Sequence, residues 1–111
     1  MKIKLQNQLR VLLDSINKII EYNNKNNFSF EEFKEHEMVF DAIIMQLLHL
    51  GETTKNMSDN FPDIDFLPVE EMIGMRNFIA HNYLGISEKM IYNTIIHDIP
   101  EIKKRIEKYL K

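Results

Sequence analysis

Apolar residues recur along the first part of the chain at the spacing of a helix. Steps of four, three, four and three residues separate the members of one stripe: Leu5, Leu9, Leu12, Ile16 and Ile19. Side chains at these spacings share one face of an α-helix. The stripe therefore predicts an amphipathic first helix. We expect it to end in the asparagine-rich stretch 23–27, because asparagine competes for backbone hydrogen bonds and favours turns.

The second predicted helix begins at a capping box. The Ser29 hydroxyl can accept the amide of Glu32, while the Glu32 side chain reaches back. Phe28 and Phe33 stand at the positions of a hydrophobic staple, which supports the same helix start. Apolar residues then continue at helical spacing: Phe33, Phe40, Ile43, Ile44, Leu47 and Leu48. They predict one helix that runs on to about residue 57.

Three shorter helices are predicted after a loop over 58–67. The third runs from about Pro68 to Asn82, and the fourth runs from a Ser87 cap to about His97. The fifth begins near Asp98 and carries an apolar stripe of Ile99, Ile102, Ile106 and Leu110. No stretch alternates apolar and polar residues as a strand would. The fold class predicted is all-α, a single-domain antiparallel bundle of about five helices over residues 1–111.

The composition narrows the chemistry that this bundle can perform. The chain has 111 residues and no cysteine, which excludes disulfides, thiol catalysis and cysteine-built metal sites. A net charge of −3 argues against a protein that coats nucleic acid through bulk positive charge, although an enzyme needs only a local positive site. No apolar run reaches the roughly 20 residues of a membrane span, and the N-terminus does not resemble a signal peptide. We therefore expect a cytoplasmic protein that does not contact membranes.

The predicted third helix is apolar nearly all round, yet it contains Arg76, Asn77 and His81. Its apolar positions after the first turn are Met72, Ile73, Met75, Phe78, Ile79 and Ala80. A helix of this kind is expected to be buried, either in a core or in an interface. A buried arginine needs an acidic partner or an anionic ligand, because an unpaired buried charge is costly. This conflict between pattern and residue type indicates a functional site.

Helical geometry limits how these polar side chains can meet. At about 100° per residue, Arg76 and Tyr83 point to the same side of a straight helix, whereas His81 is rotated by about 140° from Arg76. Asn77 and His81 are four residues apart and share a face. The arginine could curl round, the helix could distort near His81, or two copies of the chain could pair across a two-fold axis. We favour pairing, because it also explains the all-round apolar character of the helix.

The stretch Arg76-Asn77-Phe78-Ile79-Ala80-His81-Asn82-Tyr83 resembles the R-x4-H-x-Y motif of the HEPN superfamily. More narrowly, over about residues 10–110 the chain resembles the HepT-like toxins, which are encoded beside a minimal nucleotidyltransferase (MNT) antitoxin. Other matching segments are Ser29-Phe30-Glu31-Glu32-Phe33, Asp41-Ala42, Leu50-Gly51-Glu52, Ile73-Gly74-Met75-Arg76-Asn77 and Asp98-Ile99-Pro100. In one departure, Phe66 stands near a position that is usually tryptophan in the family, which we interpret as a change in packing.

This resemblance implies a metal-independent endoribonuclease that needs no cofactor and acts as the toxin of a type II toxin–antitoxin system. Arg76 and His81 would be catalytic: the arginine would hold the RNA phosphate, and the histidine would transfer a proton. Asn77 would orient His81 or the phosphate, and Tyr83 would line the same site. The resemblance also implies a homodimer formed through the helix that bears Arg76 and His81. Its partners would be RNA and an MNT-type antitoxin, which would attach AMP to Tyr83 and so block the site.

Other interpretations of the same residues stay open. Arg76 could be a structural ion-pair partner of Glu52 or Asp41, His81 a satisfied buried histidine, and Tyr83 an ordinary packing residue. The whole chain could also be a non-catalytic module that docks the nucleotidyltransferase or binds a nucleotide.

Two pairs of residues have helical spacings compatible with a metal site in a bundle. They are Glu32 with His36 and His49 with Glu52. Neither pair has a matching second pair to complete a ligand set, so we predict no metal site.

Overall fold

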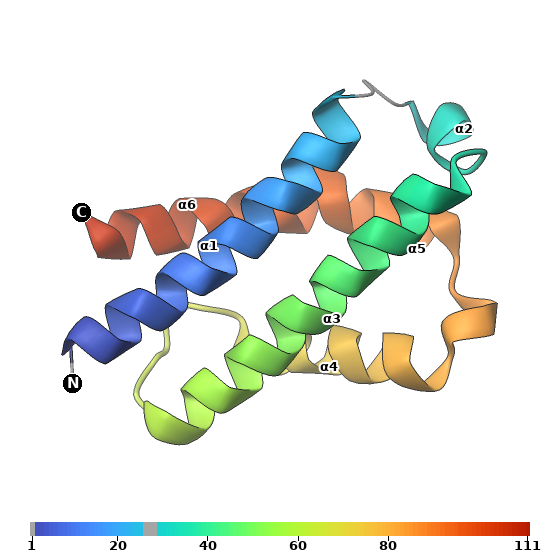
Figure 1. The fold of residues 1–111 in the computed structure, drawn as a ribbon. Helices are drawn as coiled ribbons and strands as arrows, with labels where there is room; N and C mark the ends of the chain where they lie inside the picture. Colours follow the sequence, from blue (N-terminus) through green and yellow to red (C-terminus); the bar gives the residue numbers. More distant parts are fainter. Residues whose placement is uncertain (1, 26–28) are drawn as a thin grey trace.

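The computed structural model describes residues 2–25 and 29–111, which are mostly helical (Figure 1). The α-helices are α1 (Lys2–Lys25), α2 (Phe30–Phe33), α3 (Glu37–Asn60), α4 (Val69–His81), α5 (Glu88–Asn93) and α6 (Ile99–Leu110). A 3-10 turn covers Tyr83–Gly85, and a π-helical turn, Thr94–Asp98, joins α5 to α6. The two described ranges contain no strand, and the predicted all-α fold is confirmed.

The core forms where α3 lies between α1 and α4 (Figure 1). All five residues of the α1 stripe are buried, and they face α3 and α6: Leu5, Leu9, Leu12, Ile16 and Ile19. From α6, Ile99, Ile102 and Ile106 are buried in the same core. In the described part of the chain, no helix is both long and apolar enough to cross a membrane. Helix α4 therefore packs directly against α3.

The predicted second helix is divided into two, so its continuity from residue 29 was wrong. The capping box is present: the Ser29 hydroxyl accepts the Glu32 amide at 3.3 Å and donates to the Glu32 carboxylate at 3.1 Å. After α2 the chain turns and begins again at Glu37, which lets Phe33 pack at 5.9 Å from Phe40 between ring centroids. Phe33 is fully buried, and its burial favours the turn over a straight helix. Phe28, predicted as the other half of the staple, lies outside the described residues, as does part of the asparagine-rich stretch.

The boundary predicted between the last two helices is also absent. Ser87 caps α5 as expected, with its hydroxyl accepting the Met90 amide at 3.3 Å. Asp98, expected to begin a new helix, has helical backbone angles and forms no side-chain cap. Instead the Ile99 amide donates to the Thr94 carbonyl, five residues back. A π-turn accommodates Pro100, which has no N–H for a regular helical bond, and the helical path continues through it.

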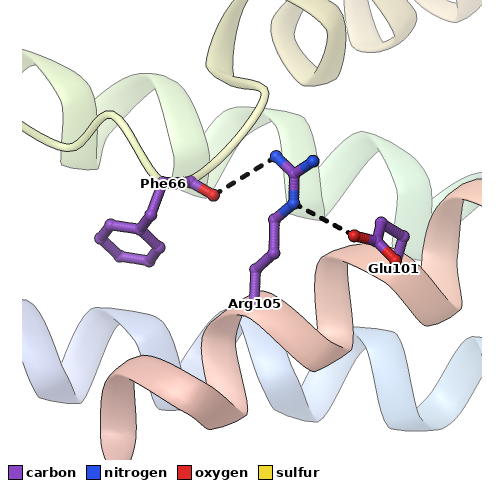
Figure 2. A network of polar contacts seen from close by, with 3 residues as sticks. All are labelled: Phe66, Glu101 and Arg105. Carbon is purple, nitrogen blue, oxygen red and sulfur yellow. Dashed lines mark hydrogen bonds and ion pairs between the residues drawn. The ribbon is translucent and has the colours of Figure 1, made fainter.

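A contact with α6 fixes the loop that leads into α4 (Figure 2). Arg105 Nη1 donates to the Phe66 carbonyl at 3.4 Å, and its Nε lies 3.5 Å from the Glu101 carboxylate. The Phe66 ring stacks on Tyr109 with centroids 4.6 Å apart. Phe66 therefore packs through an aromatic ring, in agreement with its interpretation as a packing residue. These contacts anchor the chain shortly before α4 begins.

Candidate active site

The helix α4 lies on the surface of the single chain, and one side of it is open to solvent. Only Met72 and Ile79 are buried along its length, while Phe78 is 43% exposed. The first of the two expected explanations, that the core of the single chain buries this helix on all sides, is therefore wrong. The single chain therefore leaves part of the apolar pattern of this helix exposed.

Arg76 is held by two neighbours at once. Its Nη2 lies 3.0 Å from the Glu52 carboxylate on α3, and its Nη1 donates to Asn77 Oδ1 at 3.0 Å. The Arg76 side chain is 34% exposed, so the guanidinium keeps a face toward solvent. The ion pair with Glu52 and the bond to Asn77 hold the guanidinium between α3 and its own helix. The geometry that would bring Arg76 and His81 together stays a prediction.

Gly51 explains how α3 and α4 come this close at Arg76. It is buried on α3, and a Cβ built there would overlap Arg76 Cβ and lie 3.1 Å from the Met72 carbonyl oxygen. Any larger residue at Gly51 would push the two helices apart. The glycine therefore sets the depth at which Arg76 meets its neighbour Glu52.

His81 is the last residue of α4, and it is exposed. The interpretation as a satisfied buried histidine is wrong for the single chain. Asn82 ends the helix, and both its backbone amide and its side-chain amide donate to the Phe78 carbonyl at 3.0 Å. The helix therefore changes course directly after His81. Tyr83 follows in the 3-10 turn and does not extend the stripe of Arg76 along a straight helix.

Tyr83 directs its hydroxyl at an acidic residue of α3. The Tyr83 hydroxyl donates to Asp41 Oδ1 at 3.0 Å, and the residue is 49% exposed. This hydrogen bond raises the pKa of Tyr83 above the usual value of a tyrosine. The negative charges of Asp41 and Glu37 and some loss of solvent raise it further. Tyr83 is therefore held through its hydroxyl rather than by burial of its ring.

Asp41 and Glu52 form an acidic edge on α3 beside the motif. They are eleven residues apart, about three helical turns, and so lie on the same side of α3. Asp41 contacts Tyr83 near the end of α4, and Glu52 contacts Arg76 near its middle, so the two helices run antiparallel. The sequence indicated both acids as possible partners of Arg76. Glu52 has that role, whereas Asp41 pairs with the tyrosine instead.

The described residues contain no group of three or more histidine, aspartate or glutamate side chains that could hold a metal ion. The motif itself supplies an arginine, an amide, an imidazole and a phenol. A guanidinium binds anionic oxygens through paired donors, and an exposed imidazole can exchange protons with solvent or substrate.

Comparison with known proteins gives this arrangement a context. A family model described as "Ribonuclease HepT-like" matches residues 12–109. The chain is 31% identical over 97 residues to "Putative RNase MJ1380" of Methanocaldococcus jannaschii, which covers 86% of this chain and 87% of the relative. It is 30% identical over 112 positions to "Probable ribonuclease HepT" of Thermococcus cleftensis, with 100% of both chains covered. No solved structure is significantly similar to the chain.

Proposed function

Since the chain belongs to the HepT-like ribonuclease family, we propose that it is a metal-independent endoribonuclease and the toxin of a type II toxin–antitoxin system. The observation that carries the proposal is that one helix, α4, bears Arg76 hydrogen-bonded to Asn77 and ends in an exposed His81. Arginine, amide and imidazole are the groups that phosphodiester cleavage needs when no metal takes part.

In this proposal Arg76 binds the scissile phosphate of RNA. Its planar fork of donors matches phosphate oxygens, and the Glu52 carboxylate occupies part of that fork in the free chain. An incoming phosphate would exchange places with that carboxylate. Asn77 would hold the guanidinium in position for the phosphate through the hydrogen bond that it already accepts.

His81 is proposed to move the protons. It would take the proton of the RNA 2′-hydroxyl as the 2′ oxygen attacks phosphorus, or deliver a proton to the leaving oxygen. The exposed end of α4 leaves the imidazole accessible to an RNA strand. Arg76 would stabilise the negative charge that develops on the phosphate oxygens.

The functional unit is proposed to be a homodimer formed through α4. Pairing would bury the apolar side chains that a single chain leaves open, and it would place two copies of the motif across one cleft. It would also concentrate positive charge from two arginines in a chain whose net charge is −3. RNA would then be held locally rather than by the whole surface.

RNA cleavage in the presence of EDTA tests the proposed reaction. The wild-type chain should cut RNA with EDTA present, and Arg76→Ala or His81→Ala should each reduce the rate by about 100-fold or more. His97→Ala, which removes another exposed histidine outside the motif, is the matched control and should cut at the wild-type rate. Equal cleavage by the wild type and His81→Ala would contradict the proposal.

The biological role is proposed to be growth inhibition that an MNT-type nucleotidyltransferase relieves by attaching AMP to Tyr83. Expression of the chain should slow growth, and Arg76→Ala or His81→Ala should remove the effect. An AMP on Tyr83 would introduce a bulky anion beside the site and compete with RNA for Arg76. Wild-type protein that is free of AMP and still inert toward RNA would favour the alternative, a non-catalytic docking or nucleotide-binding partner.

A further inference from the structure

We propose that Asp41 is the proton acceptor when a nucleotide is transferred to Tyr83, an inference that rests on the function proposed above. The geometry carries it. Asp41 Oδ1 lies 3.0 Å from the Tyr83 hydroxyl oxygen, which is the atom that would attack phosphorus. Both side chains are exposed, so a second protein can bring a nucleotide to them.

Among the four tyrosines of the chain, Tyr83 stands apart in its surroundings. Tyr22 and Tyr92 pack against the hydrophobic core, and the Tyr109 ring stacks on Phe66. Tyr83 is the most exposed of the aromatic side chains in the described part of the chain, and its hydroxyl meets a carboxylate. A hydroxyl that is both accessible and next to a base is suited to act as a nucleophile.

The transfer requires the phenol to lose its proton as the new bond forms. The Tyr83 oxygen attacks the α-phosphorus of a nucleoside triphosphate held by the nucleotidyltransferase, and an O–P bond forms. The bond from that phosphorus to the bridging oxygen breaks, and its electron pair leaves with pyrophosphate. The phenolic proton passes to the Asp41 carboxylate and from there to solvent.

The electrostatics of the free chain fit a proton that moves late in this step. Asp41 and Glu37 both lie on α3, and together they raise the pKa of Tyr83, so the phenol stays protonated at neutral pH. As phosphorus approaches, the phenolic oxygen loses electron density and its proton becomes strongly acidic. A carboxylate already in hydrogen-bond contact can then accept the proton without any rearrangement.

The rate of nucleotide transfer tests this role. Wild type, Asp41→Asn, Asp41→Glu and Asp59→Asn would each be incubated with an MNT-type nucleotidyltransferase and magnesium ATP, and the added mass followed by mass spectrometry. Asparagine can accept the hydrogen bond but cannot take the proton. Asp41→Asn should therefore be modified at least about tenfold more slowly, and Asp41→Glu should recover part of the rate. Asp59→Asn, an exposed aspartate elsewhere on α3, should match the wild type.

A second measurement tests whether the Asp41 carboxylate contacts the Tyr83 hydroxyl in solution, as proton acceptance requires. The absorbance titration of the protein minus that of Tyr83→Phe isolates the ionisation of Tyr83. In Asp41→Asn this ionisation should move to lower pH, because the negative charge that opposes it is gone. An unmoved titration, or modification of Asp41→Asn at the wild-type rate, would overturn the role of Asp41 and leave the ribonuclease proposal intact. No modification of the wild type would overturn it together with AMP attachment, while cleavage of RNA is judged separately through His81→Ala.

Discussion

At the scale of single residues, Glu52 pairs with Arg76, the residue proposed to bind the RNA phosphate. Its carboxylate lies 3.0 Å from Nη2 of the arginine, and the two side chains are 48% and 34% exposed. We expect Glu52→Gln to bind RNA several-fold more tightly, because a neutral amide no longer competes with the phosphate. A noncleavable 2′-O-methyl RNA, followed by fluorescence anisotropy at fixed ionic strength, measures this without involving catalysis.

The ion pair between Glu31 and Lys34 at α2 provides a matched control for Glu52→Gln. Glu31 forms an equally short ion pair, 3.0 Å, with Lys34 near α2, and Glu31→Gln should leave RNA affinity unchanged. Both variants should be about as stable as the wild type, since exposed ion pairs contribute little. Weaker RNA binding by Glu52→Gln would show that Glu52 holds Arg76 in place instead of competing for it.

The residues of the motif could be identified from the sequence, but their contacts could not. Arg76, Asn77, His81 and Tyr83 stood out because polar groups interrupted an apolar helix at motif spacing. Glu52 and Asp41 both stayed open as partners of Arg76, since both acids precede the motif and their distance from it in sequence does not give the register of α3 against α4. That register depends on packing between helices, which a single-helix pattern does not encode.

At the scale of elements, the close approach of α3 and α4 depends on Gly51. Gly51→Ala should destabilise the fold by about 1–2 kcal/mol, because the overlap with Arg76 outweighs the better helix propensity of alanine. Chemical denaturation followed by circular dichroism measures the change. RNA cleavage should also fall, since Arg76 is displaced from Glu52 and Asn77.

Gly74 provides the control for this comparison. It lies in α4, and a Cβ there would meet no atom within 4 Å. Gly74→Ala should therefore stabilise the chain by up to about 1 kcal/mol through helix propensity alone. If Gly51→Ala were as stable as Gly74→Ala, close packing at Arg76 would not be a constraint on this fold.

The helices themselves were largely predictable, and the errors have specific causes. The α1 stripe and the caps at Ser29 and Ser87 were correct, because each depends on residues close in sequence. The break before Glu37 was missed, since it follows from the burial of Phe33 against distant elements. The continuous path into α6 was missed because an aspartate shortly before a proline is also typical of a helix start. Here a π-helical turn accommodates Pro100, and the helix is not interrupted.

At the scale of the whole molecule, the sequence contains more apolar surface than one chain can bury. Five of the exposed large apolar side chains lie on α3, α4 and the turn after α4: Met38, Met45, Phe78, Tyr83 and Leu84. Four others lie on α1, the π-helical turn and α6: Ile3, Val11, Ile96 and Tyr109. Large exposed apolar surfaces typically mark interaction sites. Periodicity alone could predict that the apolar faces of α4 would be buried. It could not tell whether the core of the same chain or a second copy of the chain would bury them.

A charged residue at Phe78 tests whether a second copy provides that cover. Phe78 is 43% exposed on α4, and Phe78→Asp would place a carboxylate where two chains are proposed to meet. We expect this variant to be monomeric in sedimentation equilibrium, because burying an unpaired charge in an apolar contact is costly. RNA cleavage should be lost with the dimer although Arg76 and His81 are unchanged.

The control for Phe78→Asp is a charge on an exposed apolar residue away from the motif. Ile3 on α1 is 72% exposed, and Ile3→Asp should leave both the dimer and the cleavage rate as in the wild type. Measuring both the oligomeric state and the cleavage rate of Phe78→Asp shows whether cleavage depends on the dimer. A monomeric Phe78→Asp that still cuts RNA at the wild-type rate would mean that one chain holds a complete site. A dimeric Phe78→Asp would place the contact elsewhere on the chain.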